Sequence, residues 1–291
     1  KCMFDHSGEL YFSDFINKVV FDVQFDKASI ASNDLNYFYN EFGKNNVFYV
    51  DTHLIGTLNN FTTHNLKLVD KNQSEIVGTI NFQNLFGKGD QAFYMKGNFD
   101  RLTSSYDRLK AILPRILGKN LPSTSDKLGT VNMIGGVELT QKYINADVYL
   151  MSKLGELESN LSMQNIDVID NALYKGNLIL NDFDLGTLLG QQEIGRATVN
   201  LDVDGRGFTQ KLLNTAIKGE IRKFYYNGYN YQNITVDGSM KMPYYKGYFN
   251  SNDPNLKMDF DGTIDLSLKA SNYDFKAQID YADLHILNFY K

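Results

Sequence analysis

Strict alternation of apolar and polar residues is the feature that most constrains the fold of this chain. It is clearest over residues 256–270, where one face would carry Leu256, Met258, Phe260, Gly262, Ile264, Leu266, Leu268 and Ala270. The residues between them are Lys, Asp, Thr and Ser. Because successive side chains of a β-strand point to opposite faces, this pattern predicts one long strand with a dry face and a wet face.

The same alternation recurs along the chain, within residues 46–59, 197–203, 233–242 and 273–281. In the last of these, Tyr273, Phe275, Ala277, Ile279 and Tyr281 would share one face. We expect about 15 such strands, joined by short turns such as those at residues 227–228 and 252–255. Glycines inside the expected strands, such as Gly176, Gly219 and Gly262, are typical of bulges and bends. Aligned glycines would let a sheet fold along a crease.

Three helical stretches interrupt the expected strands. Residues 32–42 have apolar side chains at helical spacing before Gly43, and residues 104–117 carry a wide apolar stripe. For the second stretch we expect a capping box between Ser104 and Asp107, and a kink or early end at Pro114. The third is a short turn over residues 184–190, with Asp184 as its N-cap.

The expected fold is mainly β: an elongated, curled antiparallel sheet that forms a U-shaped apolar groove, with a few short helices. A large dry face must be covered by a second sheet, by closure, by helices or by an apolar ligand. We treat residues 1–291 as one segment, with residues 118–127 as a possible loop break. Because the chain starts with Lys1 and shows no signal peptide, we expect it to belong to a longer protein.

Composition excludes several functional classes. The chain is 43% hydrophobic and 22% charged with a net charge of −5, which argues against disorder and against a basic nucleic-acid-binding surface. Its single cysteine, Cys2, excludes an internal disulfide. The sequence contains no run of 18 consecutive apolar residues, so it predicts no membrane-spanning helix.

The sequence contains no motif that indicates catalysis or a cofactor. His6, His53, His64 and His285 are far apart and do not follow metal-binding spacing, although His53 and His64 can face each other across a hairpin. Asp202 and Asp204 lack the further ligands of a calcium loop, so a solvated strand face is the better interpretation. We therefore expect no enzyme activity, no cofactor and no metal.

An ordered series of short motifs resembles the TamB branch of the AsmA-like family, in the form found in Bacteroidota-type Gram-negative bacteria. The series comprises residues 174–178, 182–186, 188–190, 195–208, 217–221, 228–238, 245–248, 253–256, 259–262 and 282–284. Residues 56–60, 121–122, 128–129 and 154–155 extend the resemblance towards the N-terminus. No single motif is specific, but their order spans more than 100 residues.

The resemblance implies a segment of a periplasmic protein tethered to the inner membrane, with the anchor absent from this chain. Members of the family are proposed to act as bridge-like lipid-transfer proteins that hold phospholipid acyl chains in a β-groove for outer-membrane biogenesis. They are also linked to outer-membrane protein assembly and translocation with a TamA- or BamA-type barrel. The implied partners are therefore phospholipid, such a barrel, and the membranes at the ends of the parent chain.

Combining the alternation with this resemblance, we expect the groove to be lined by alternate residues of the last strands. These are Ile234, Val236, Met240, Leu256, Met258, Phe260, Ile264, Leu266, Leu268, Phe275, Ala277 and Ile279. Packing inside a closed sandwich is the alternative for each of them. Two other functions stay open: an assembly module whose edge strands guide client strands, and a glycan-binding surface formed by Tyr225, Tyr226, Tyr229 and Tyr231.

Overall fold

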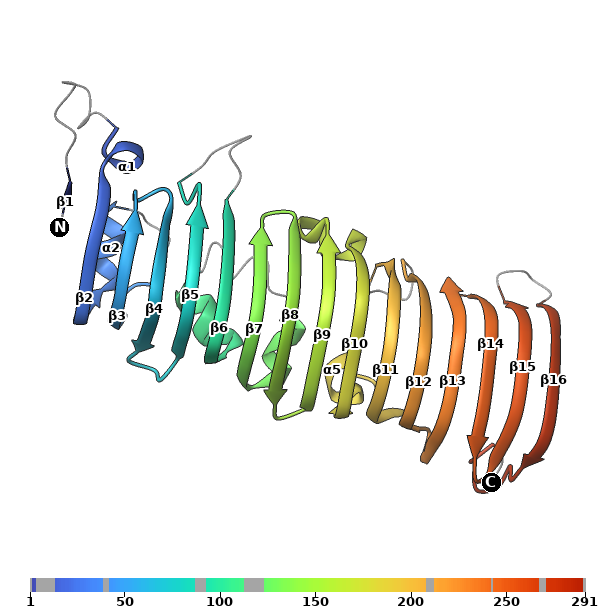
Figure 1. Cartoon of the computed structure of the whole chain (residues 1–291). Helices are drawn as coiled ribbons and strands as arrows, with labels where there is room; N and C mark the ends of the chain where they lie inside the picture. Colours follow the sequence, from blue (N-terminus) through green and yellow to red (C-terminus); the bar gives the residue numbers. More distant parts are fainter. Residues whose placement is uncertain are drawn as a thin grey trace. The chain divides into compact units, whose positions relative to one another are not determined.

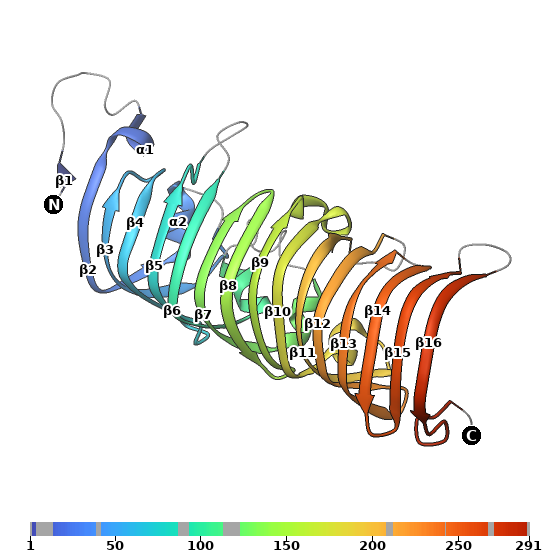
Figure 2. The same ribbon diagram turned by 45° about the vertical axis from the view of Figure 1, so that its right-hand side comes forward.

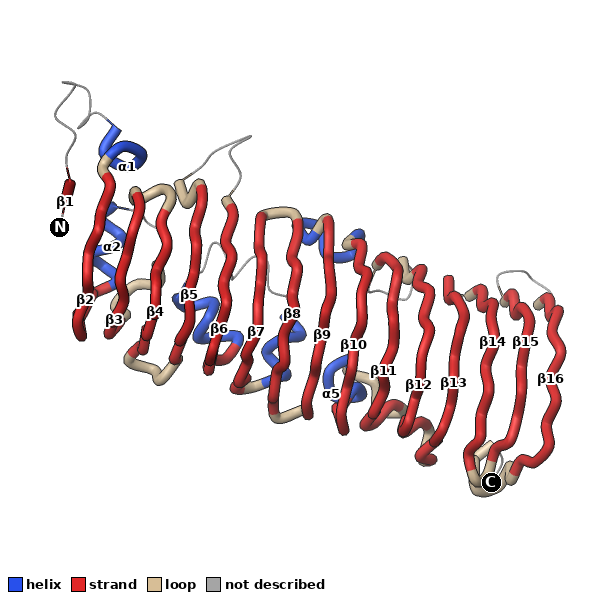
Figure 3. The backbone as a smooth tube through the Cα atoms, viewed as in Figure 1, coloured by secondary structure: helices blue, strands red, loops and turns tan. Residues whose placement is uncertain are grey.

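The computed structural model describes residues 2–3, 14–38, 42–86, 93–112, 123–207, 212–241, 243–266 and 271–289. The chain divides into two compact units, Lys1–Lys153 and Leu154–Lys291, here called unit 1 and unit 2. Strands dominate the described part of both units, and the helices are short (Figure 3).

Unit 1 is an antiparallel meander in which each strand pairs with its neighbours in the chain (Figure 1). Its strands are β1 (Cys2–Met3), β2 (Val20–Ala31), β3 (Val47–Gly56), β4 (Phe61–Asp70), β5 (Glu75–Gln83), β6 (Tyr94–Ser105), β7 (Thr130–Thr140) and β8 (Tyr143–Ser152). Its helices are α1 (Phe15–Lys18), α2 (Ser32–Phe38), α3 (Tyr106–Ile112) and the 3-10 helix η2 (Ser123–Leu128).

Unit 2 repeats this plan (Figure 1). Its strands are β9 (Gly155–Gln164), β10 (Leu173–Asp184), β11 (Ile194–Arg206), β12 (Asn214–Tyr226), β13 (Tyr229–Lys241), β14 (Tyr244–Asp253), β15 (Leu256–Asp265) and β16 (Asn272–Ala282). The 3-10 helix η3 (Ile166–Asn171) and helix α5 (Leu185–Leu189) connect strands of this unit.

The strands of both units are arcs rather than straight rods (Figure 2). Bulges cause part of this curvature, because an extra residue bends a strand and increases its twist. In unit 1, Lys27 and Asn65 have positive φ angles of 51° and 49° inside the bulges of β2 and β4. In unit 2, Asp182 has a φ of 44° inside the bulge of β10. The expected mainly β fold with a curled antiparallel sheet is therefore confirmed within each unit.

Glycines complete the bends where a side chain has no room. Gly176 in β10 has a φ of 150°, a backbone conformation that L-residues with a side chain rarely adopt. A methyl group at this position would collide with the carbonyl oxygen of Asn160 in β9. In unit 1, Gly78 has a φ of 151°, and a methyl group there would meet the carbonyl oxygen of Asn98. These glycines allow close approach of neighbouring backbones at the bends, as expected from the sequence.

The two expected turns at residues 227–228 and 252–255 both join paired strands. Asn227 and Gly228 have φ angles of 47° and 88°, the left-handed pair that tight hairpins require. Asp184 is the N-cap of α5, and its carboxylate accepts a hydrogen bond of 2.8 Å from the backbone N–H of Thr187. The C-cap is Gly190, with a φ of 71°.

One predicted helix start is wrong. Ser104 does not cap a helix, because it lies in β6 opposite Val131, is fully buried, and shares a 2.9 Å hydrogen bond with the hydroxyl of Ser74. Helix α3 begins two residues later, and the hydroxyl of Ser105 accepts a hydrogen bond from the backbone N–H of Arg108. Sheet pairing thus takes precedence over the local capping pattern. Residues 113–117 of the predicted helix, with Pro114, lie outside the described part of the chain.

Two further expectations fall partly outside the described residues. The predicted helix over residues 32–42 corresponds to α2, and residues 39–41 are not described. Within the possible loop break at 118–127, residues 118–122 are not described and the remainder belongs to η2.

Candidate functional site: an apolar face across paired strands

The strand register of unit 2 aligns apolar side chains in rows that run across the strands. Residues directly opposite each other in an antiparallel pair project to the same face, so the register defines each row. From β9 to β16, one row is Leu157, Leu180, Val199, Ile221, Ile234, Ser251, Met258 and Ile279. The next is Ser159, Leu178, Leu201, Gly219, Val236, Phe249, Phe260 and Ala277.

Two more rows continue the same face. The third contains Leu161, Gly176, Val203, Ile217, Gly238, Gly247, Gly262 and Phe275. The fourth contains Met163, Tyr174, Gly205, Thr215, Met240, Tyr245, Ile264 and Tyr273. We call these four rows the apolar face of unit 2. Four glycines share the third row, which is the alignment expected of a crease.

Most of the predicted lining residues belong to this face. Nine of them lie in its rows: Ile234, Met258, Ile279, Val236, Phe260, Ala277, Phe275, Met240 and Ile264. Leu256 lies on the same side of β15, two residues before Met258. Leu266 follows the end of β15, and its backbone N–H donates to the carbonyl of Pro243. Leu268 lies outside the described residues.

The structure shortens and interrupts two of the predicted strands. The predicted strand over residues 256–270 is shorter in the structure, where β15 ends at Asp265. Leu266 is described but is not part of a strand, and residues 267–270 lie outside the described residues. A register shift between β15 and β16 places Tyr281 opposite Lys257, a residue of the polar face, whereas Ile279 stays opposite Met258. The predicted common face of β16 therefore ends at Ile279. A bulge reverses the side-chain phase, and no sequence signal marks it here.

The apolar face of unit 2 is buried or half-buried over β9–β15 and exposed in β16. Val199 and Ile234 are buried, with exposed fractions of 6% and 5%. Val236 and Phe260 are half-buried, and Ile279 is 58% exposed. The rings of Phe260 and Phe275 lie 5.0 Å apart, so aromatic packing supplies part of the surface. Strands β13–β16 therefore present apolar surface that other side chains of the unit leave accessible to water.

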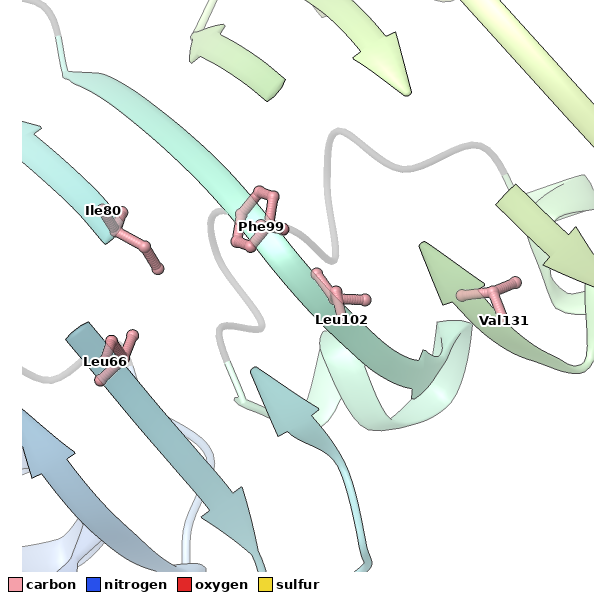
Figure 4. Close-up of a cluster of buried hydrophobic side chains, with 5 residues drawn as sticks. All are labelled: Leu66, Ile80, Phe99, Leu102 and Val131. Carbon is pink, nitrogen blue, oxygen red and sulfur yellow. The ribbon is translucent and has the colours of Figure 1, made fainter. Parts of the chain in front are cut away.

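The predicted lining residues do not include the comparable face of unit 1 or the part over β9–β12, although the alternation at residues 46–59 and 197–203 belongs to these regions. In unit 1 a buried cluster consists of Leu66, Ile80, Phe99, Leu102 and Val131 (Figure 4). Apolar residues of β3, β5, β7 and β8 pack against this cluster, as does Leu128 of η2. The sequence signal for these residues is the same alternation of apolar and polar positions, but bulges change its phase and make it harder to follow.

Hydroxyl groups on these faces are turned towards the backbone. Ser251, 2% exposed, donates to the carbonyl of Leu256 at 2.8 Å. Thr52 and Thr63 donate to the carbonyls of His64 and Ile80 at 2.9 and 3.2 Å. Since these donors are satisfied within the sheet, the faces remain chemically apolar despite their Ser and Thr residues.

The opposite face of each sheet carries ordered charge pairs. Lys218 and Asp237 lie 2.7 Å apart across β12 and β13, and Lys175 and Asp204 lie 2.8 Å apart across β10 and β11. The hydrogen bond that Lys175 donates to Asp204 raises the pKa of Lys175. Asp202 accepts from the Asn177 amide at 3.0 Å, so this aspartate belongs to the solvated face, as expected.

Two of the tyrosines considered for glycan binding, Tyr229 and Tyr231, take part in packing, whereas Tyr226 is 46% exposed. The Tyr229 hydroxyl donates to Asp253 at 2.6 Å, and burial, followed by this hydrogen bond, raises the pKa of Tyr229. The fully buried Asp253 also accepts from the backbone N–H groups of Gln232 and Asn255. The Tyr231 ring packs edge-on against Tyr229 at 4.8 Å. This network joins the start of β13 to the end of β14, at the ends of the strands away from their turn.

His6 lies outside the described residues, so the remaining candidates for chemistry are Cys2, His53, His64 and His285. Over the described ranges, no group of three or more His, Cys, Asp or Glu residues is placed to hold a metal ion. His53 and His64 do lie opposite each other, on β3 and β4. Within the part of the chain that is described, no helix has both the length and the hydropathy needed to cross a bilayer.

The apolar faces and their polar reverse sides are thus the candidate functional surfaces of the described chain. Comparison with protein-family models, curated proteins and solved structures finds no match to this chain.

Proposed function

We propose that this chain is a segment of a bridge-like lipid-transfer protein that holds phospholipid acyl chains on its apolar face. The parent protein would be tethered to the inner membrane, cross the periplasm and deliver lipid for outer-membrane biogenesis. The observation that carries the proposal is the set of apolar rows across β9–β16, which are half-buried in places over β9–β15 and exposed in β16. The resemblance to the TamB branch supports the same function.

The physical argument starts from the exposed apolar area. Removing apolar surface from water stabilises a complex by about 25 cal/mol per Å². Side chains such as Phe260, Phe275 and Ile279 therefore favour an apolar occupant over water. Acyl chains suit such rows because the hydrophobic effect is non-directional, so a chain can shift from one strand to the next without breaking specific bonds.

The polar side of the sheet supports the assignment of roles to the two faces. Its lysines and aspartates pair with each other across neighbouring strands, as Lys218 does with Asp237. These charges stay hydrated, so they keep this side in contact with water. Lipid headgroups would remain at the wet rim while the acyl chains occupy the apolar face.

The first test is native mass spectrometry of the purified chain for co-purifying phospholipid. The expected result is bound phospholipid that is released on denaturation. An empty protein that also fails to take up phospholipid from vesicles contradicts the proposal. If that empty protein crosslinks through its edge strands to outer-membrane protein precursors, the assembly function replaces lipid transfer.

A charge placed on the apolar face gives the sharper test. Phe275→Asp changes a residue that is 45% exposed, so the fold should tolerate it. Because a carboxylate must lose water to sit against acyl chains, we expect bound lipid to fall by at least about tenfold. The matched control is Ser239→Asp, which puts the same charge on the polar side of β13, opposite Lys246. Equal lipid binding by the two variants contradicts the proposal.

A further inference from the structure

Two histidines and one aspartate come together on three adjacent strands of unit 1. His53 of β3 lies directly opposite His64 of β4, and their ring centroids are 6.2 Å apart. On the other side, Nε2 of His53 lies 2.6 Å from a carboxylate oxygen of Asp22 in β2. Asp22 and His53 are 31 positions apart along the sequence, and His53 and His64 are 11 apart; the sheet register brings all three together.

We propose that His53 and His64 form a chelating site for a first-row divalent transition metal ion such as Zn²⁺, with Asp22 as the residue that positions His53. This site does not depend on the proposed lipid function, because it lies in unit 1 and uses other residues. The metal would join β3 to β4 and, through Asp22, hold β2 in the same network.

The arrangement of the three groups matches the chemistry of histidine ligands. A metal-bound imidazole almost always uses its second ring nitrogen to bond a carboxylate, a carbonyl or water, which fixes the orientation of the ring. Asp22 bonds Nε2 of His53, so a metal ion would take Nδ1. Imidazole nitrogen is a preferred ligand of Zn²⁺, Cu²⁺ and Ni²⁺ and a poor one for Mg²⁺ and Ca²⁺.

The distance between the rings is close to what a chelate needs. With metal–nitrogen distances of about 2.0–2.1 Å, two imidazoles around a tetrahedral metal place their centroids about 5 Å apart. The observed 6.2 Å is wider, and the exposed His64 can approach by rotating its side chain. The His53 side chain is 38% exposed, which leaves access for the ion and for water ligands that complete its coordination.

The test is calorimetric titration of the whole chain with ZnCl₂ near neutral pH, where imidazole is largely deprotonated. We expect one Zn²⁺ per chain in wild type. Both His53→Ala and His64→Ala should weaken it by at least about tenfold, since even an outer-shell partner contributes 10–100-fold to affinity. Asp22→Asn should weaken binding less than the loss of either ligand.

His285→Ala is the matched control, because it removes an imidazole from unit 2. Its Zn²⁺ affinity should equal that of wild type. Zn²⁺ affinity that is unchanged in His64→Ala overturns the proposal, as does the absence of wild-type binding at about 1 mM Zn²⁺, a concentration that would reveal even a weak site. Circular dichroism of each variant shows whether the sheet is retained, so a loss of binding is not confused with unfolding.

Discussion

The apolar face of unit 1 and the β13–β16 part of unit 2 share one sequence pattern but differ in packing. In unit 1, Phe99 and Leu102 are 7% and 8% exposed and lie within a cluster that η2 also covers. In β13–β16, Ile234 is buried, but Phe275 and Ile279 are 45% and 58% exposed. Alternation therefore decides which side of a strand is apolar, whereas neighbouring elements decide whether that side is sealed.

This difference suggests two roles for similar side chains. A sealed apolar face stabilises its own unit, because its area is already removed from water. A half-exposed face stabilises the fold less and retains area for an occupant. The predictions below test this contrast, beginning with the largest expected effect.

Removing a phenyl ring should cost much more stability in unit 1 than in β16. We expect Phe99→Ala to lower the free energy of unfolding by about 3–5 kcal/mol, because it leaves a cavity in a buried cluster. Phe275→Ala should cost about 1 kcal/mol, since this ring is exposed and mainly loses its contact with Phe260. Urea unfolding followed by circular dichroism measures both values. Equal losses of stability would remove the distinction between sealed and open faces.

Glycines at the bends should be as important in unit 2 as in unit 1. Gly176→Ala and Gly78→Ala each force a side chain into a left-handed backbone and against a neighbouring carbonyl. We expect each to lower the free energy of unfolding by about 2 kcal/mol or more. The control is Gly136→Ala in β7, where a methyl group would meet only the Asn98 side chain, at 3.3 Å. A neutral result at Gly176 would mean that the crease of unit 2 is adaptable.

The smallest effect concerns the cap of α5 and its dependence on pH. The backbone hydrogen bond from Thr187 lowers the pKa of Asp184. Since the folded pKa lies below the unfolded value of about 3.9, the ionised cap stabilises unit 2 fully above that pH. This stability is lost as the pH falls through the folded pKa.

We expect Asp184→Ala to cost about 1 kcal/mol at pH 7, towards the lower part of the range for caps because solvent screens this carboxylate. The difference from wild type should shrink below about pH 4. Asp184→Asn keeps a capping oxygen and serves as the control. A difference that stays constant down to pH 2 would contradict the role of the ionised carboxylate.

Much of the fold follows from local pattern, and the failures have physical causes. The turn at Asn227 and Gly228 and the cap at Asp184 were predictable because each depends on a few adjacent residues. Ser104 was misassigned because its sheet partner Val131 lies far along the chain. The phase change before Tyr281 was missed because a bulge depends on the fit between two strands, which neither strand reveals alone.

The candidate site was predictable to a similar extent. Alternation identified Ile234, Val236 and Phe260 as members of one face, and the register places them there. It did not indicate that Ile234 is sealed while Ile279 is exposed. The pairing of His53 with Asp22 was also beyond the sequence, since a third strand supplies the carboxylate.

The sequence by itself determined the strand period, the apolar and polar sides of each strand, and the tight turns between them. These properties depend on backbone geometry within a few residues, which local composition specifies. The tertiary structure alone decided the strand register, the positions of the bulges, and which apolar side chains are covered. Burial and register depend on side chains from other strands, so they are set only when the sheet has formed.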